Sequence, residues 1–347
     1  METIAYTRQQ QRTKPLSLAK KLIYGLGELP YGILNSVIGT FLMLYYVQII
    51  GVSASSIGLL IGLALLLDAL TDPILAEFSD RLRSRLGRRH ALMYASSIPF
   101  GLSIYCLMAP PQDLDDALLL TWVGSFLVLT RLCYTVFSIP WEALLPELGG
   151  DYEGRASLAA WRRFSAWLVS TIGVGFVMLV IFAGSDAYPQ GQLNPDAYPA
   201  YALFAGLSIT ICILVTTHFT RDQIPYLLQP QVSSSITPQM LVNSIASVIA
   251  NKNFQMLMCG VLIFFCVGAV ATSFDIFVFT YFWRLTSEDL FVLQVGGMFG
   301  AVTGVIVAAQ LVKRFQKHQL LILAIAANIC LNASLPVLRL GDVFLSR

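Results

Sequence analysis

The sequence predicts an all-α polytopic membrane protein. Hydrophobic residues make up 56% of the 347 residues, charged residues make up only 12%, and the mean hydropathy is +0.70. The apolar residues form long runs, and the basic residues gather in the segments between alternate runs. Soluble domains have about 25% charged residues, so this composition predicts a chain that lies mostly in lipid.

Nine apolar runs are long enough to cross a hydrocarbon layer of about 30 Å, which needs about 20 helical residues. They cover residues 22–49, 55–78, 91–109, 117–146, 161–184, 198–218, 254–283, 289–312 and 319–337. The first, fourth and seventh runs exceed the minimum length, which predicts tilted or kinked helices rather than further spans.

The basic residues predict the orientation of these spans. If the N-terminus is cytoplasmic, 18 of the 22 Lys and Arg residues fall in cytoplasmic segments and three in outer segments. This bias follows the positive-inside rule. The first twenty residues are polar and basic, so no cleavable signal peptide is expected. The sequence therefore predicts an integral protein of the plasma (inner) membrane with a cytoplasmic N-terminus.

The spacing of the spans predicts three parts. Residues 1–219 are expected to form an N-terminal six-helix transmembrane bundle, 220–253 a cytoplasmic linker with a surface helix, and 254–347 a partial C-terminal bundle. The linker helix would begin at Thr237 and Pro238, because threonine caps helix starts and proline suits the first turn. Two sets of spans joined by a linker are the organisation of a two-half transporter.

Two carboxylates, Asp68 and Asp72, lie inside the second apolar run. An ionised Asp at this depth costs several kcal/mol, so it is retained mainly where it faces a wet cavity or a partner. The i, i+4 spacing places both on one helical face, where they can share one cation or one proton. The alternative is a structural pair neutralised by a buried arginine.

A polar face is expected on the fourth span. Five of its residues recur at three to four residues and share one side of the helix, which Pro140 interrupts; they are Arg131, Tyr134, Ser138, Trp141 and Glu142. An aromatic ring beside a hydroxyl and a carboxylate suits a small-molecule pocket. The equal alternative is that Arg131 only neutralises Asp68 or Asp72.

Other chemistries have no support in these residues. The six cysteines all fall in apolar runs, no zinc spacing occurs, and no Ser-His pair or GxSxG elbow lies at a plausible depth. The net charge of +2 is explained by topology, so no nucleic-acid partner is expected. We therefore expect no enzyme, no cofactor, and no metal beyond a transported Na⁺.

Three motifs resemble a known family. They are Tyr24-Gly-Leu-Gly-Glu28, the stretch Asp68-Ala-Leu-Thr-Asp-Pro73 with Ser79-Asp-Arg-Leu-Arg-Ser-Arg-Leu-Gly-Arg-Arg89, and Tyr134-Thr-Val-Phe-Ser-Ile-Pro-Trp-Glu-Ala-Leu-Leu-Pro-Glu147. Together with Asp151-Tyr-Glu-Gly-Arg155 and Arg163 they resemble the glycoside-pentoside-hexuronide:cation symporters, the melibiose-permease-like branch of the major facilitator superfamily. The resemblance covers the chain from about residue 20 to its end.

The resemblance implies twelve helices in two bundles, alternating access, and symport of a sugar-like solute with Na⁺ or H⁺. The cation site would map onto Asp68 and Asp72, with Thr71 and Thr135 as neighbours. Because the melibiose carriers often have Asn where this chain has Thr71, the identity of the ion stays open.

The family's inner-loop motif maps onto the basic segment after the second span, where it would lock neighbouring helices; its residues here are Asp80, Arg81, Arg85, Arg88 and Arg89. Topology alone also explains these arginines. Glu28 would belong to the cavity or to an inner gate, and Arg163 would help to position the solute.

Two departures from the family limit the substrate. The galactoside-binding acids of the first and fourth spans correspond here to Gly32 and Ser138, so galactoside recognition is not carried over. Relatives of the fold also carry lysophospholipids, which leaves an amphiphile as an alternative solute. About three family helices are missing after the ninth span, so a truncated, nontransporting remnant is a further alternative. Neither the direction of transport nor the oligomeric state is predicted.

Overall fold

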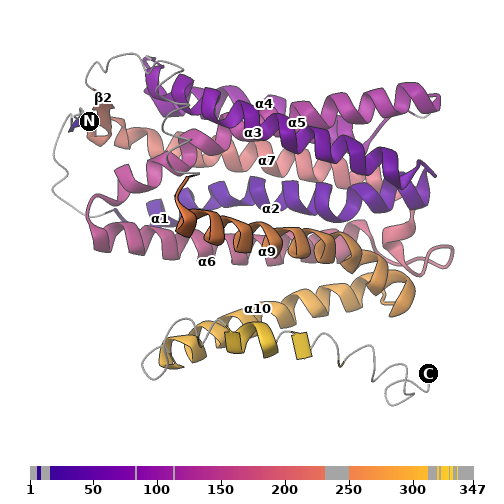
Figure 1. The fold of residues 1–347 in the computed structure, drawn as a ribbon. Coiled ribbons are helices and arrows are strands. Elements are labelled where there is room, and N and C mark those ends of the chain that lie inside the picture. The colour runs from indigo at the N-terminus through magenta and orange to yellow at the C-terminus, as the bar shows by residue number, and fades with distance from the viewer. Residues whose placement is uncertain are drawn as a thin grey trace. The chain divides into compact units, whose positions relative to one another are not determined.

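The computed structural model describes residues 6–8, 16–82, 84–111, 114–230, 250–311, 319, 322–327, 329, 330 and 334. The chain divides into two compact units, Met1–Phe291 and Val292–Arg347. The described residues are almost entirely helical (Figure 1). This agrees with the predicted fold class.

The first span is one long helix, Leu18–Ile49, whose winding changes along its length. It consists of α1 (Leu18–Gly25), the 3₁₀ turn η1 (Leu26–Glu28), α2 (Leu29–Asn35), and the π-helical segments η2 (Ser36–Phe41) and η3 (Leu44–Ile49). The Ser17 side chain accepts a hydrogen bond from the backbone N–H of Lys20, which caps the start. Gly27 lies where neighbouring helices approach closely, and a Cβ there would overlap the indole of Trp141.

The other long helices follow in chain order. They are α3 (Ala54–Arg81), α4 (Arg88–Met108), α5 (Asp116–Gly149), α6 (Tyr152–Phe176) with the π-helical η4 (Val177–Ile181), α7 (Tyr198–Thr220), α9 (Lys252–Phe277) with the π-helical η8 (Val278–Phe282), and α10 (Ser287–Leu311). Three 3₁₀ turns join them: η5 (Gly191–Leu193), η6 (Pro195–Ala197) and η7 (Arg221–Tyr226). Asp115 and Asp151 cap α5 and α6 by accepting from Leu118 N and Gly154 N.

Seven helices in the described residues are long and apolar enough to cross a membrane. They coincide with the first seven predicted spans. The eighth predicted span coincides with α10, and most of the ninth, 319–337, lies outside the described residues.

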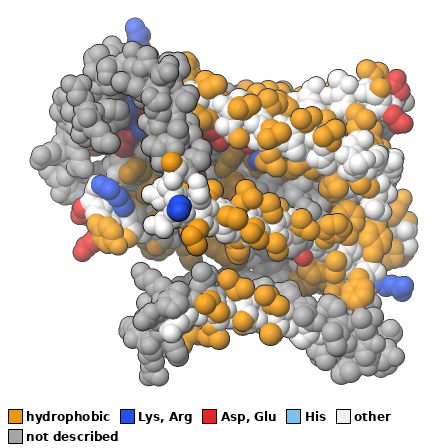
Figure 2. Space-filling model, in the orientation of Figure 1, with side chains coloured by type: hydrophobic (Ala, Val, Ile, Leu, Met, Phe, Trp, Pro, Cys, Tyr) orange, Lys and Arg blue, Asp and Glu red, His pale blue; other side chains and the backbone are white. Residues whose placement is uncertain are grey.

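The core of the first unit lies between α4, α5 and α7, and α5 also packs against α3 and α6. Aromatic rings fill the interior, as where Tyr45 stacks on Tyr198 with ring centroids 4.3 Å apart. α2 packs against α6 and α7, and α9 contacts η2. Exposed apolar side chains cover α3 and α9, for example Leu70 and Phe264 at 67% exposure each (Figure 2). In a membrane such surfaces face lipid.

A buried polar network joins the segment after η4 to the start of α10. Gln192 is fully buried; its Nε2 donates to Thr280 Oγ1 at 3.2 Å, and its Oε1 accepts from Ser287 Oγ at 2.9 Å. The Gln192 carbonyl accepts from Tyr198 OH at 2.9 Å. Every one of these buried polar groups has a hydrogen-bond partner. Through Gln192 the network links η8, which follows α9, to the start of α7.

Two short strands form a feature that the sequence analysis did not predict. β1 (Tyr6–Arg8) pairs antiparallel with β2 (Leu228–Pro230), with Tyr6 opposite Pro230. Because they pair, both strands lie at the same end of the bundle, and the chain between them must cross it an even number of times. Six spans meet this requirement.

The expected surface helix of the linker falls mainly on 231–249, outside the described residues. The division of the chain at 219 and 253 stays a prediction.

Candidate functional site

Asp68 is held on α3 by two residues of α5. Its Oδ2 lies 3.0 Å from Arg131 Nε, and its Oδ1 accepts from Thr135 Oγ1 at 3.3 Å. The Asp68 side chain is only 14% exposed and that of Arg131 17%. The structure therefore contains the arginine–aspartate pair that the sequence analysis gave as an alternative, together with the predicted Thr135 contact.

Asp72 lies one helical turn further along α3 and is exposed. Among the described residues, no hydrogen bond or ion pair joins its carboxylate to a side chain. Thr71 donates to the Asp68 carbonyl at 3.2 Å, so its hydroxyl hydrogen is engaged with the backbone. Asp72 is thus the exposed member of the pair, and Asp68 is the member held by α5.

Pro73 adds a further oxygen to this part of α3. Proline has no N–H, so the carbonyl of Ala69 lacks its usual donor four residues later. The Ala69 carbonyl, the carboxylates of Asp68 and Asp72 and the hydroxyl of Thr135 are oxygen groups of the kind that hard cations prefer. No cluster of three or more His, Cys, Asp or Glu side chains in the described ranges could hold a metal ion.

The predicted polar face of α5 contacts several helices at different heights. At one level Arg131 reaches α3, and about one turn on Tyr134 stacks on Tyr31 of α2, with ring centroids 5.9 Å apart. Ser138 is 9% exposed, and Pro140 lies inside α5. The face therefore contacts α3 and α2 rather than forming one surface.

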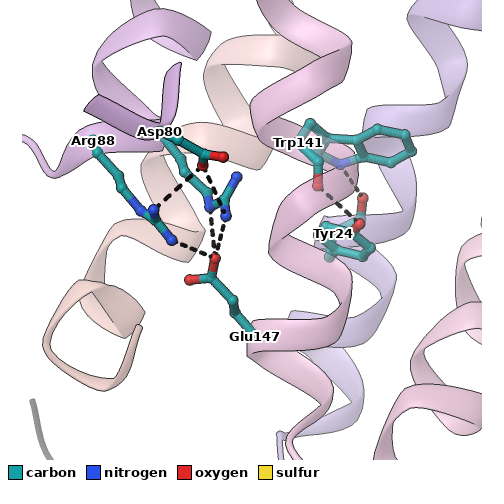
Figure 3. A network of polar contacts seen from close by, with 6 residues as sticks. Tyr24, Asp80, Arg88, Trp141 and Glu147 are labelled. Carbon is teal, nitrogen blue, oxygen red and sulfur yellow. Dashed lines mark hydrogen bonds and ion pairs between the residues drawn. The ribbon is translucent and has the colours of Figure 1, made fainter. Parts of the chain in front are cut away.

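Trp141 is packed inside the bundle. It is 2% exposed, the Arg162 guanidinium lies 4.2 Å from the centre of its ring, and Tyr24 stacks on it at 5.2 Å. Trp141 Nε1 donates to the Tyr24 carbonyl at 3.2 Å, and Tyr24 OH donates to the Trp141 carbonyl at 3.1 Å (Figure 3). In this structure the indole has no open face on which a solute ring could stack, contrary to the role expected for it.

Glu28 lies at the centre of a second charged group. Arg162 Nε donates to its Oε2, Arg163 Nη1 donates to its Oε1 at 3.0 Å, and Arg162 Nη2 lies 3.5 Å from Glu142 Oε1. The side chains of Glu28 and Arg162 are 7% and 15% exposed, whereas Arg163 and Glu142 are 69% and 58% exposed. This charged group therefore has a buried half and an open half.

Sequence reasoning missed Arg162, which the structure places against Trp141, Glu142 and Glu28. The available signal was the pair of adjacent arginines at the start of an apolar run: only one of two neighbours can point into the bundle, because adjacent side chains on a helix point about 100° apart. The buried Glu28 also required a cationic partner.

A third cluster joins the start of α4 to the end of α5. Glu147 Oε1 accepts from Arg88 Nη2 at 2.9 Å and from Arg89 Nε at 2.7 Å, and Asp80 Oδ1 lies 3.3 Å from Arg88 Nη1 (Figure 3). Arg85 is exposed, and the side chain of Arg81 is outside the description. The predicted inner-loop motif thus contributes Asp80, Arg88 and Arg89 to one cluster.

Glu147 is the acceptor at the centre of this cluster, and the sequence predicted no role for it beyond its place at the end of the third motif. Its side chain is 3% exposed. An acid at the end of a long apolar run needs a cation, and the arginines before the next span were the nearest source.

Comparison with known proteins identifies the family. The family model described as MFS/sugar transport protein matches residues 23–344. The uncharacterized symporter sll1374 of Synechocystis is 27% identical over 72% of this chain and 46% of its own length, and the putative glycoside/cation symporter YagG of Escherichia coli is 25% identical over 66% and 48%. The sodium-dependent lysophosphatidylcholine symporter 1 of Gallus gallus is 24% identical over 74% and 42%.

This chain spans about half the length of the curated relatives that it matches. The family match nevertheless covers most of the chain and includes all three charged clusters. The chain belongs to the MFS/sugar transport protein family.

Proposed function

We propose that this chain carries out cation-coupled symport of a sugar or glycoside-like solute by alternating access. The observation that supports this most directly is the carboxylate pair on α3, of which Asp68 is held by Arg131 and Asp72 is open. A carboxylate inside an apolar helix is costly unless it faces water or a partner, and such residues commonly mark ion paths. The name of YagG, a putative glycoside/cation symporter, agrees with this assignment.

Charge balance suggests how the ion is taken up. Asp68, Asp72 and Arg131 together carry one net negative charge, so one monovalent cation neutralises the group. Burial of an uncompensated charge costs several kcal/mol. The group with its bound cation is neutral, so apolar surroundings can cover it at a lower cost in free energy than the empty, negatively charged group. Either Na⁺ or a proton provides this charge.

The solute would lie along α5, beside Tyr134 and Ser138. This position is between the group around Asp68 and the group around Glu28. Glu142 and Arg163 are the exposed members of the second group, while Glu28 and Arg162 form its buried base. The four side chains carry no net charge, which suits an uncharged solute with hydroxyl groups. The exposed carboxylate and guanidinium can accept from and donate to such hydroxyls.

We assign the Asp80, Arg88, Arg89 and Glu147 cluster to the inner gate. In this assignment the protein lies in the plasma (inner) membrane with a cytoplasmic N-terminus, and the cluster holds the cytoplasmic ends of α3, α4 and α5 together. The positive-inside bias of the sequence supports this orientation.

Transport in vesicles tests the proposal. Vesicles that contain the full chain receive an inward Na⁺ gradient at constant pH or an inward proton gradient without Na⁺, and uptake of radiolabelled pyranosides is measured. We expect accumulation with one of the two gradients, and we expect Asp72→Asn to abolish it while Asp222→Asn leaves it unchanged. Equal gradient-driven uptake by Asp72→Asn and the wild type would contradict the assigned role.

The lysophosphatidylcholine symporter relative supports a second candidate solute, an amphiphile. The same vesicles distinguish the two. If lysophosphatidylcholine below its micellar concentration is accumulated and pyranosides are not, the amphiphile is the solute.

A further inference from the structure

Tyr31, on α2, is an aromatic ring with one covered face and one open face. It stacks on Tyr134 of α5 with ring centroids 5.9 Å apart and planes at 30°, and Tyr134 is itself backed by Phe100 at 6.1 Å. Tyr31 is nevertheless 43% exposed. Its position is therefore set by the rings of Tyr134 and Phe100 behind it, while its front surface is free.

Three rings that pack against the charged group based on Glu28 are closed. Tyr24, Phe137 and Trp141 are 0%, 1% and 2% exposed, and the face of Trp141 is occupied by Arg162. Tyr31 is the open ring on the α2 side of this group, at 43% exposure; on α6, Phe164 and Trp167 are also exposed. Of the rings that pack between the first span and α5, Tyr31 is therefore the one with surface free for a solute.

The surroundings of Tyr31 leave room for a solute. Gly32 is its neighbour, and a Cβ built on Gly32 would meet nothing within 4 Å. Glu28 precedes Tyr31 by three residues and so lies on the same side of the helix. α9 contacts η2, which continues α2. The space-filling view shows a hollow between two rows of apolar side chains, with charged side chains visible in it (Figure 2).

The hydroxyl of Tyr31 argues against a lipid-facing role. Within the described ranges no hydrogen bond joins this hydroxyl to another residue. A hydroxyl without a partner in hydrocarbon costs about 1–3 kcal/mol on the scale of protein mutations. A wet cavity avoids that cost, because water or a solute hydroxyl completes the bond.

We propose that Tyr31 is the aromatic platform of the solute site, on which the apolar face of a pyranoside ring or its aglycone lies. The proposal deepens the proposed function and rests on it. The ring hydroxyls at the edge of the solute point toward the exposed Glu142 and Arg163. Tyr31 takes the stacking role that residue type alone suggested for Trp141.

Binding measurements on the full chain in detergent test this proposal. The probes are p-nitrophenyl α- and β-pyranosides, and the readouts are the solute-induced and the Na⁺-induced thermal shifts. We expect Tyr31→Ala to weaken pyranoside binding roughly tenfold, which corresponds to about 1.4 kcal/mol, and to leave the Na⁺-induced shift unchanged. Tyr31→Phe keeps the ring and should stay within roughly threefold of the wild type, or about 0.7 kcal/mol.

Tyr152→Ala is the matched control, because Tyr152 is 87% exposed at the start of α6 and, in the part of the chain that the structure describes, no hydrogen bond, ion pair or ring contact joins it to the site. The platform role is overturned if Tyr31→Ala binds pyranosides as the wild type does, or if Tyr31→Phe loses as much affinity as Tyr31→Ala. Failure of the wild type to bind any pyranoside, with or without Na⁺, would overturn the proposed function and the platform together.

Discussion

Replacing Glu147 by Gln should destabilise the protein by about 3 kcal/mol. One oxygen of Glu147 accepts three hydrogen bonds from two guanidinium groups: Arg88 Nη2 at 2.9 Å, Arg89 Nε at 2.7 Å, and Arg89 Nη2. The three side chains are 3–9% exposed, so water screens the interaction little. Gln keeps the shape and an acceptor oxygen but removes the charge.

The magnitude follows from these contacts. A hydrogen bond to a charged group contributes about 1.5–3 kcal/mol and a neutral one about 0.5–1.5 kcal/mol, so each of the three loses roughly 1 kcal/mol. The total of about 3 kcal/mol lies at the low end of the about 3–5 kcal/mol for breaking a buried ion pair. With about 2 °C per kcal/mol in a chain of this size, the unfolding midpoint should fall by about 6 °C.

Fluorescence-detected thermal unfolding in detergent measures this shift. The matched control is Asp222→Asn, which breaks the pair with Lys20, because those side chains are 30% and 52% exposed. Exposed pairs contribute about 0–1 kcal/mol, so the control should shift the midpoint by no more than about 2 °C. Equal shifts in the two variants would refute the reasoning from burial.

Three further predictions concern other parts of the chain. Gly27→Ala should lower the unfolding midpoint by the equivalent of about 1–3 kcal/mol, because its methyl group overlaps an indole ring; Gly32→Ala, which meets open space, should leave it unchanged or slightly higher. If Na⁺ is the coupling ion, Arg131→Gln should tighten Na⁺ binding roughly tenfold in calorimetry, since Asp68 loses its competing guanidinium; unchanged or weaker binding would contradict this. Gln192→Leu should cost about 1–3 kcal/mol for each buried hydroxyl left without its partner, and an unshifted thermal midpoint would show that the network contributes nothing.

Several features of the site could be predicted from residues alone. Asp68 and Asp72 stand out because a charge within an apolar run is costly wherever the helix packs. The helical period predicts that they share one face of the helix. For Arg131 the sequence left two hypotheses, a place in a solute pocket or the neutralisation of Asp68 or Asp72. The pairing of Arg88 and Arg89 with Glu147 needed a further fact, namely that the start of α4 lies beside the end of α5.

Side-chain exposure could not be predicted in the same way. Trp141 and Tyr31 are both aromatic residues in apolar spans, yet one is 2% and the other 43% exposed. Gly27 lets η1 pack directly on the indole of Trp141, whereas Tyr31 has the ring of Tyr134 on one side and lies beside the open space at Gly32. Arg162 and Arg163 are likewise adjacent in sequence and differ in exposure from 15% to 69%.

By itself the sequence determined that this is a helical membrane protein, where the first seven spans lie, and which helix carries the intramembrane carboxylates. These properties depend on the transfer of residues from water to lipid and on the local period of the helix, so each can be read within one segment. The tertiary structure alone decided which carboxylate is paired, which arginine contacts Trp141, and which ring is open. Those properties depend on which neighbouring helix covers each side chain, and the residues that meet can lie far apart in the sequence, as Tyr24 and Trp141 do at 117 positions.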